Sequence, residues 1–508
     1  MDASSAALTP DPPAQGALVR LGRRLAAPYA LDLRSLALCR VGLGAAALGL
    51  ALARLRNATA LYSDAGILTR AAAHKWVNLP GSFALGFLSG SPVFAAALLG
   101  LAALSAVGVV LGWHTRACTV VCWALTWAAR ERNLLAMNGG DDVVVLFLFW
   151  GAFLPLGARA SLDALRAPSP PRGTIASLAT VGFVVQLFCI YFFAALLKNG
   201  VSWRVDGSAL YRSLALDMFA TPLGIWLRQF HGLCRWLTFA TFDLEFVGGF
   251  LLLFPFFVAP VRTALVASFV ALHVGIGLTL HIPIFCCGTI AAWLALTPSY
   301  AWERVTVPAW VRARRPALIR FAPRFVPPRK LPSWAQALAA AALVLVLASN
   351  TSALLGAQPL SPRVAWLLQA TGLAQAWTMF APNPLLRDGW YVFPATLADG
   401  AQVDLDRGGP PTFARPASVA HAYRDSRWRS VLISLAAPDG KPFLPGLARY
   451  LCARWNGRHP AAERAVHVAV VFMDEETLPD DPVPPAQKRT LFEGDCAGSA
   501  SPGRASSP

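Results

Sequence analysis

The amino-acid sequence predicts an all-α polytopic membrane bundle of about nine transmembrane helices, followed by a small C-terminal α+β domain outside the membrane. Of the 508 residues, 56% are hydrophobic and only 14% are charged, whereas soluble domains contain about 25% charged residues. The chain also has 17 Trp and 29 Phe, many of them near the ends of apolar runs, where membrane proteins place interfacial aromatic side chains.

Nine apolar segments are candidate membrane spans, because a spanning helix needs roughly 20 mostly apolar residues. They are Ser35–Ala53, Pro92–Gly112, Ala117–Arg130, Val143–Ala158, Thr174–Leu197, Trp236–Val261, Thr263–Leu280, Ile282–Tyr300 and Ser333–Leu354. Pro283 separates the seventh segment from the eighth. Residues 57–90 and the stretch after Lys198 mix polar with apolar residues, which predicts short helices lying in the interface.

The formal net charge of +17 comes from 44 basic and 27 acidic residues. Such a charge is compatible with nucleic-acid binding. However, the arginines lie between apolar runs, as they do in loops that face an anionic leaflet, so no nucleic-acid partner is expected. Nine spans and a cytoplasmic N-terminus put every basic cluster on one side, including the strongest, between Arg304 and Lys330. The C-terminal domain then lies in the periplasm of a bacterial cell, outside the inner membrane.

Composition divides the chain into four parts. Residues 1–30 are polar and Pro-rich, without the pattern of a cleavable signal peptide, and are predicted to be a disordered tail. Residues 31–358 form the membrane domain. Residues 359–490 combine a hairpin pattern around an Asp-Gly turn, an amphipathic helix and a strand, and form the predicted α+β domain. Residues 491–508 are of low complexity and are predicted to be disordered.

The nine cysteines predict neither a disulfide framework nor a metal site. Most of them lie in apolar segments, where a thiol behaves as a small hydrophobe. Cys118 and Cys122 are four residues apart, but the sequence places no further ligands near them. Cys286 and Cys287 are interpreted as packing residues.

Ionisable residues inside predicted spans cost about 2.5–3.5 kcal/mol each on insertion scales, so each needs a partner or a function. Asp243 either lies at the interface or points inward toward a cation such as Arg132 or Lys198. His273, in the middle of the seventh segment, is either a hydrogen-bonded packing residue or a proton carrier.

Lys198 follows a run from Thr174 to Leu197 that contains no charged residue, in the stretch IYFFAALLKNGVSW. A lysine that ends a span is an interfacial anchor in one interpretation. In the other, a desolvated lysine loses proton affinity and can act as a base or nucleophile. The loop RERNLLAMNGGDD also leaves two alternatives: Asn138 begins a turn, or this loop brings its backbone and Asp141 toward a ligand.

The segment IYFFAALLKNGVSWRVDGSAL resembles the part of vitamin K-dependent γ-glutamyl carboxylase that contains its active-site lysine. The matching positions are Tyr191, Phe192, Ala194, Lys198, Trp203 and Gly207. Two later segments, FDLEFVGGFLLLF and LHVGIGLTLHIPIF, are similar to later helices of that family. Together with NGGDD and the tail WTMFAPNPLLRDGWYVFPATLADG, they resemble the bacterial HTTM proteins, which share the transmembrane domain of the carboxylase, over most of residues 30–480.

In that family a neutral lysine deprotonates a reduced naphthoquinone, so the resemblance implies that Lys198 is a base acting on a quinol-like, lipid-soluble substrate. His273 matches a histidine of the corresponding helix. The site implied comprises Lys198, His273, Asp243 and Asp141 for proton transfer, and Asn138, Tyr191 and Trp203 for substrate contact. Two departures argue against protein carboxylation: no histidine follows Asn138 in its loop, and a much smaller domain replaces the large luminal portion of the carboxylase.

Three functions therefore compete at the level of the sequence. The first is a carboxylase-like membrane enzyme that uses a reduced quinone. The second is a non-catalytic anchor or assembly protein whose outer domain binds an envelope partner. The third, a transporter, is disfavoured because polar residues within the predicted spans are few and no inverted repeat of broken helices is apparent.

Overall fold

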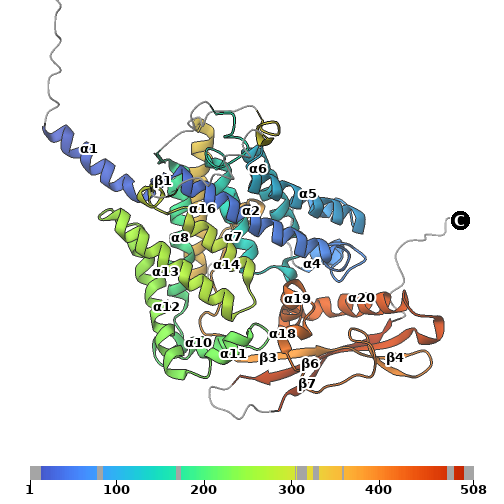
Figure 1. The fold of residues 1–508 in the computed structure, drawn as a ribbon. Coiled ribbons are helices and arrows are strands. Elements are labelled where there is room, and N and C mark those ends of the chain that lie inside the picture. Colours follow the sequence, from blue (N-terminus) through green and yellow to red (C-terminus); the bar gives the residue numbers. More distant parts are fainter. Residues whose placement is uncertain are drawn as a thin grey trace, which may run out of the picture.

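The computed structural model describes residues 13–76, 84–167, 173–303, 305, 317–323, 331–356, 360–477 and 485–496. Figure 1 shows a bundle of helices with a sheet, covered by further helices, at one of its ends. The prediction of a disordered tail at residues 491–508 was wrong at its start, because residues 491–495 belong to the strand Gln487–Asp495 and Cys496 forms a disulfide; residues 497–508 lie outside the described residues.

Helices occupy all nine segments selected from the sequence. They are α2 (Leu33–Arg56), α5 (Pro92–Leu111), α6 (Thr115–Arg132), α7 (Gly139–Phe153), α8 (Leu178–Leu197), α12 (His231–Leu252), α13 (Val258–Thr279), α14 (Pro283–Leu294) and α16 (Ser333–Leu355). Pro283 stands at the first turn of α14 and separates it from α13, as predicted.

Five of the described helices, α2, α5, α8, α13 and α16, are long and apolar enough to cross a membrane. The chain is therefore an integral membrane protein. Helix α14 is apolar but has only 12 residues. Helix α7 has 15 residues and is only about 22 Å long, shorter than the hydrocarbon core of about 30 Å. Helices α6 and α12 also fall outside these five, so the count of nine spans remains a prediction.

Short helices fill the segments of mixed composition. They are α3 (Ala58–Tyr62), α4 (Arg70–Trp76), α9 (Val201–Arg204), α10 (Ala209–Leu214) and α11 (Pro222–Leu227). Within the segment predicted to be a disordered N-terminal tail, residues 13–26 form the helix α1 (Pro13–Ala26). A short pair of strands, β1 (Leu31–Asp32) and β2 (Thr174–Ile175), ties the start of α2 to the chain just before α8.

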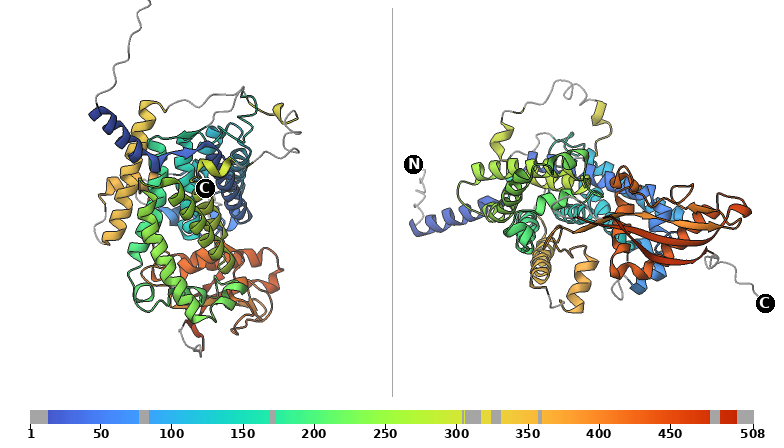
Figure 2. Two further views of the ribbon diagram at one scale, coloured as in Figure 1. Left: turned by 60° about the vertical axis from the view of Figure 1, so that its left-hand side comes forward. Right: turned by 90° about the horizontal axis from the view of Figure 1, so that it is seen from below.

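The C-terminal region is an antiparallel sheet with helices on one face (Figure 1, Figure 2). Its strands are β3 (Arg387–Val392), β4 (Pro394–Leu397), β5 (Gln402–Asp404), β6 (Ala465–Glu476) and β7 (Gln487–Asp495). β6 pairs with β7 along one edge and with β3 and β4 along the other. The helices beside it are α18 (Val419–Ala422), α19 (Ser426–Ala436) and α20 (Leu444–Asn456), whereas α17 (Pro362–Ala370) packs on the bundle, where Leu368 joins the central core. The hairpin β4–β5 confirms the turn predicted at its Asp-Gly pair.

The C-terminal region and the bundle share one hydrophobic core. Leu61 of α3 and Leu68, just before α4, pack in the same buried cluster as Trp428 of α19 and Leu447 of α20. A second cluster fills the centre of the bundle. Because burial of apolar area stabilises by about 25 cal/mol per Å², this shared core holds the C-terminal region firmly against one end of the bundle.

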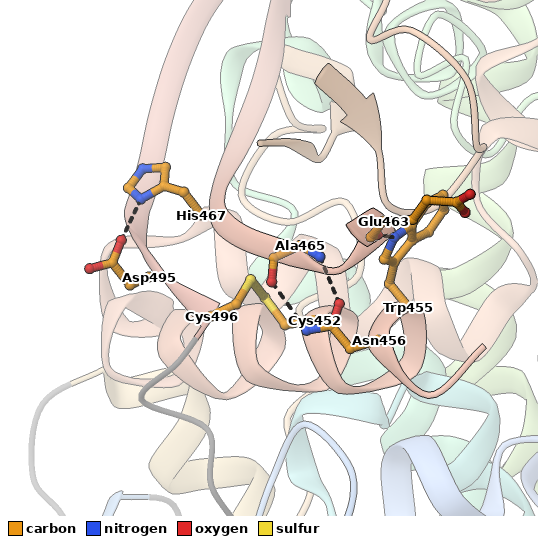
Figure 3. The surroundings of a disulfide bond; sticks show 8 residues. All are labelled: Cys452, Trp455, Asn456, Glu463, Ala465, His467, Asp495 and Cys496. Carbon is orange, nitrogen blue, oxygen red and sulfur yellow. Dashed lines mark hydrogen bonds and ion pairs between the residues drawn. A yellow bond between two sulfur atoms is a disulfide. The ribbon is translucent and has the colours of Figure 1, made fainter. Parts of the chain in front are cut away.

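The expectation that the cysteines form no disulfide was wrong for one pair. Cys452 of α20 is bonded to Cys496, directly after β7, and the other seven cysteines are free. Figure 3 shows this bond beside the hydrogen bonds that Asn456 makes with the backbone of Ala465, so α20 is tied to both β7 and β6. No local pattern signals this pairing, because the two cysteines are 44 residues apart and the fold alone brings them together.

Replacing both Cys452 and Cys496 by serine is expected to lower the free energy of unfolding of the C-terminal region by about 4 kcal/mol. In the chain-entropy model, the bond restricts a 44-residue loop in the unfolded chain. Thermal unfolding of the purified full-length protein measures the effect, and Cys287→Ser, at an exposed free cysteine, is the control. An unfolding temperature unchanged in the double variant contradicts the assignment.

A buried carboxylate lies where the sheet meets the bundle. Asp388 of β3 accepts hydrogen bonds from the backbone N–H groups of Met218 (2.9 Å) and Gly389 (2.6 Å). Burial raises the pKa of Asp388 to about 7, from an ordinary value of 3.8. The native protein therefore holds a proton between about pH 4 and pH 7 that the unfolded chain has lost.

Since the native state binds the additional proton, stability should fall as the pH rises from about 4 to about 7, by at most about 1.4 kcal/mol per pH unit. In Asp388→Asn this component of the pH dependence should disappear. The measurement is chemical unfolding of wild type and variant across this pH range. Parallel pH profiles for the two proteins would contradict the prediction.

Candidate functional site

A mostly apolar cavity of about 420 Å³ lies between α8, α12 and α13, near the end of the bundle that carries the C-terminal region. Its walls are formed largely by aliphatic and aromatic side chains, among them Ile190, Leu244 and Ile276. Four residues with titratable side chains also line it: Tyr191, Lys198, Glu245 and His273. Apolar walls with a few polar groups are typical of sites for small organic ligands.

Lys198 lies inside this wall and does not extend into open water. It caps the C-terminus of α8, where its backbone N–H bonds to the carbonyl of Ala194. Its amine forms a salt bridge with the carboxylate of Glu245 on α12. Lys198 is 5% exposed and Glu245 8%, and the amine lies 4.7 Å from the centre of the Trp203 ring.

The segment after α17 closes the cavity beside Lys198. The backbone N–H of Gly200 bonds to the carbonyl of Pro382 at 3.1 Å, and the indole N–H of Trp203 bonds to the carbonyl of Phe380 at 2.8 Å. A Cβ atom on Gly200 would lie 2.2 Å from the side chain of Asn383, so a larger residue there would force that side chain to move. The motif WTMFAPN thus covers the loop that contains Lys198.

A second polar cluster joins Tyr191 and His273, which line the cavity, to Trp293 of α14. The Tyr191 hydroxyl lies 2.6 Å from Nε2 of His273 and accepts a hydrogen bond from the Trp293 indole at 2.8 Å. Because the tyrosine oxygen accepts from Trp293, its own proton can be donated to His273 Nε2. His273 Nδ1 has no hydrogen-bond partner among the described residues. Tyr191 and Lys198 are two helical turns apart on α8, so they share one face.

The structure brings four of the predicted site residues to this cavity: Tyr191, Lys198, Trp203 and His273. Asp243 is exposed and does not line it. Residues two positions apart on a helix point in directions that differ by about 200°, so the side chains of Asp243 and Glu245 lie on nearly opposite faces of α12. The candidate cation Arg132 is instead paired with Asp64, at 3.3 Å.

Glu245 was not among the predicted site residues, although the segment FDLEF contains it. The buried positions of α12 include Glu245, Gly248, Gly249 and Leu252. Gly248, Gly249 and Leu252 follow Glu245 by three, four and seven residues, so all four lie on one face of the helix. The two glycines permit close helix packing, so an acid in register with them was the stronger candidate for an inward position.

Asp141 and Asn138 lie outside the cavity and have structural contacts. Asn138 caps α7 by accepting from the backbone N–H of Gly140, and Asp141 accepts from the backbone N–H of Asn138. The Asp141 carboxylate, 0% exposed, binds Arg54 of α2 at 2.7 Å and Arg427 of α19 at 2.6 Å. This buried network joins the bundle to the C-terminal region.

Asn138 lines a second cavity, of about 370 Å³, between α7 and α19. The two cavities share four lining residues: Ile282, Phe285, Trp377 and Met379. In the part of the chain that the structure describes, no group of three or more His, Cys, Asp or Glu side chains is arranged to hold a metal ion.

Comparison with known proteins identifies the bundle. A family model, the HTTM domain, matches residues 31–299, which is more than half of the chain and includes Lys198, Glu245 and His273. No curated protein and no solved structure matches. The HTTM domain is shared with vitamin K-dependent γ-carboxylase, as the sequence resemblance indicated. The chain therefore belongs to the HTTM family.

Proposed function

We propose that this protein is a membrane enzyme in which Lys198 removes a proton from a lipid-soluble substrate of the quinol class. The observation that carries the proposal is the placement of the Lys198 amine, 5% exposed, in the wall of an apolar cavity. Exclusion of water strengthens electrostatic interactions with a bound substrate, and the apolar walls suit a substrate that enters from the lipid.

Glu245 supplies a proton acceptor, which a buried lysine needs in order to lose its proton and act as a base. An ammonium–carboxylate pair and a hydrogen-bonded amine–carboxylic acid pair have the same net charge of zero, so moving the proton between them buries no additional charge. With its proton on Glu245, the Lys198 amine has a free lone pair. It then takes the proton of a substrate hydroxyl: the O–H bond breaks, an N–H bond forms, and the oxyanion lies beside an ammonium ion.

In this proposal Tyr191 and His273 hold a substrate oxygen and relay protons, and Trp203 shields the amine from water. Their arrangement supports these roles, since the Tyr191–His273 hydrogen bond is 2.6 Å long and both side chains line the cavity. Asn138 and Asp141 have structural roles, and Asp243 has no role in the chemistry.

We also propose that the chain crosses the membrane nine times, from a cytoplasmic N-terminus to a periplasmic C-terminal region in a bacterial cell. The Asp141–Arg427 ion pair and the bond from Met218 to Asp388 support a common side for the predicted outer loops and the sheet. The disulfide supports an oxidising compartment for that side. A protease added outside the inner membrane should cut a recognition sequence inserted at Gly409 and should not cut one inserted before α1. Cleavage before α1 without cleavage at Gly409 would contradict this orientation.

A non-catalytic anchor is the second candidate. It is favoured by β7, which among the described strands pairs with β6 alone, because an unpaired sheet edge can bind an added strand of an envelope protein. In that case the deletion of residues 381–490 abolishes function, whereas Lys198→Arg has no effect.

Purification of the full-length protein from native membranes, followed by mass spectrometry of bound lipids and quinones, tests the enzyme proposal. We expect a quinone in stoichiometric amount, lost in Lys198→Ala and retained in Lys441→Ala, which alters an exposed lysine. A wild-type protein without a quinone would favour the anchor.

A further inference from the structure

Residues 19–26 of helix α1 (Pro13–Ala26) present a basic side and an apolar side, and no part of the chain that the structure describes covers either. Arg20, Arg23 and Arg24 are spaced by three and four positions and share one face, while Leu21 and Leu25 are four apart on the opposite face. Residues 19–26 are all exposed, with Leu21 at 53% and Leu25 at 54%. No acidic residue occurs in the helix.

The connection to the bundle fixes α1 near the membrane surface. Six residues separate its end at Ala26 from the first residue of α2, Leu33, and six residues reach at most about 20 Å. Arg262 of α13 holds this connection by donating to the carbonyls of Pro28 and Ala30. Since α2 is long and apolar enough to span the membrane, α1 lies close to where that span meets water.

This end of the bundle is the one opposite the C-terminal sheet (Figure 1, Figure 2). A second described segment there, residues 317–323, has the same chemistry: Arg320 stands between exposed Ile319 (37%) and Phe321 (59%). Arg166, in the loop after α7, donates to the Ile319 carbonyl at 3.1 Å and keeps this segment at the same end. Two separate segments thus present arginine beside uncovered apolar side chains.

We propose that α1 is a docking helix for the anionic surface of the membrane that the protein itself spans. Leu21 and Leu25 enter the boundary between headgroups and acyl chains, and Arg20, Arg23 and Arg24 bind lipid phosphate groups. Each arginine near an anionic surface increases affinity about fivefold, so the three together contribute about a hundredfold. A second copy of α1 is a poor occupant, because two faces that carry only arginine repel each other.

Hydrogen exchange of the full-length protein in lipid nanodiscs tests this proposal. The backbone amides of residues 13–26 should exchange at least tenfold more slowly in discs with 30% phosphatidylglycerol than in discs of phosphatidylcholine alone. The variant Arg20→Gln/Arg23→Gln/Arg24→Gln should lose this difference. The variant Leu21→Ser/Leu25→Ser should exchange rapidly in both lipids.

A matched control replaces three exposed arginines of the C-terminal region, Arg407, Arg458 and Arg464, by glutamine; exchange in α1 should then match that of the wild type in each lipid. Equal exchange of wild-type α1 in both lipids contradicts the proposal. So does protection that depends on the number of protein copies in each disc and not on lipid charge.

Discussion

Lys198→Ala should lower turnover of a quinol substrate by about a thousandfold and leave the protein inserted in the membrane, since a positioned general base contributes about 10²–10⁴-fold. Lys198→Arg should be equally inactive, because a guanidinium keeps its proton in proteins and cannot act as a base. Glu245→Gln should lose about a hundredfold, because an amide cannot accept the proton that frees the Lys198 amine.

The measurement is turnover by purified protein in nanodiscs with a short-chain quinol, with Lys441→Ala as the control. Thermal unfolding of each variant separates loss of chemistry from loss of fold. Full activity of Lys198→Arg would remove Lys198 as the base and leave the anchor as the better account. Full activity of Glu245→Gln would remove only the role of the partner.

The second large effect concerns the buried network around Asp141. Asp141→Asn should lower the free energy of unfolding by about 3–5 kcal/mol, because it leaves Arg54 and Arg427 buried without a counter-charge. Their side chains are 2% and 1% exposed, so water cannot replace the carboxylate. Arg427→Met should cost less, since the Arg54–Asp141 pair remains and an apolar side chain fills the space.

Chemical unfolding of the full-length protein measures this difference, and Asp439→Asn, at an exposed carboxylate, is the control. The same network connects α2, α7 and α19. The Asp141 variant should therefore also expose the junction between bundle and sheet to protease. Stability equal to that of wild type in Asp141→Asn would contradict the structural role assigned to this carboxylate.

Local sequence patterns predicted the individual elements well. The strand expected in residues 359–490 is β6, Ala465–Glu476, with the sequence AVHVAVVFMDEE, and the expected amphipathic helix is α20, which ends at Asn456, directly before Gly457. Hydropathy located the helices, but it could not establish nine spans, because α7 and α14 are short and because α6 and α12 also fall outside the five helices that are long and apolar enough. The disulfide and the shared core depend on contacts between distant segments, which local patterns do not encode.

The candidate site was predictable in part. The sequence selected Lys198 because a charge after a long apolar run is costly, and it selected Tyr191, Trp203 and His273 through the family resemblance. It could not show that the amine is enclosed, because the covering residues Trp377 to Phe380 come from about 180 positions later in the chain. Depth along the predicted span favours Asp243 as the inward acid. Direction around the helix decides instead for Glu245, which lines the cavity.

The enclosure of the Lys198 amine can be measured directly by competitive acylation of the lysines in the reconstituted protein with a water-soluble reagent, followed by mass spectrometry. Lys198 should react at least a hundredfold more slowly than Lys441, because its side chain is 7% exposed and paired with Glu245. Equal rates for the two lysines would place the Lys198 amine in open water, and the proposed proton transfer would lose its physical basis.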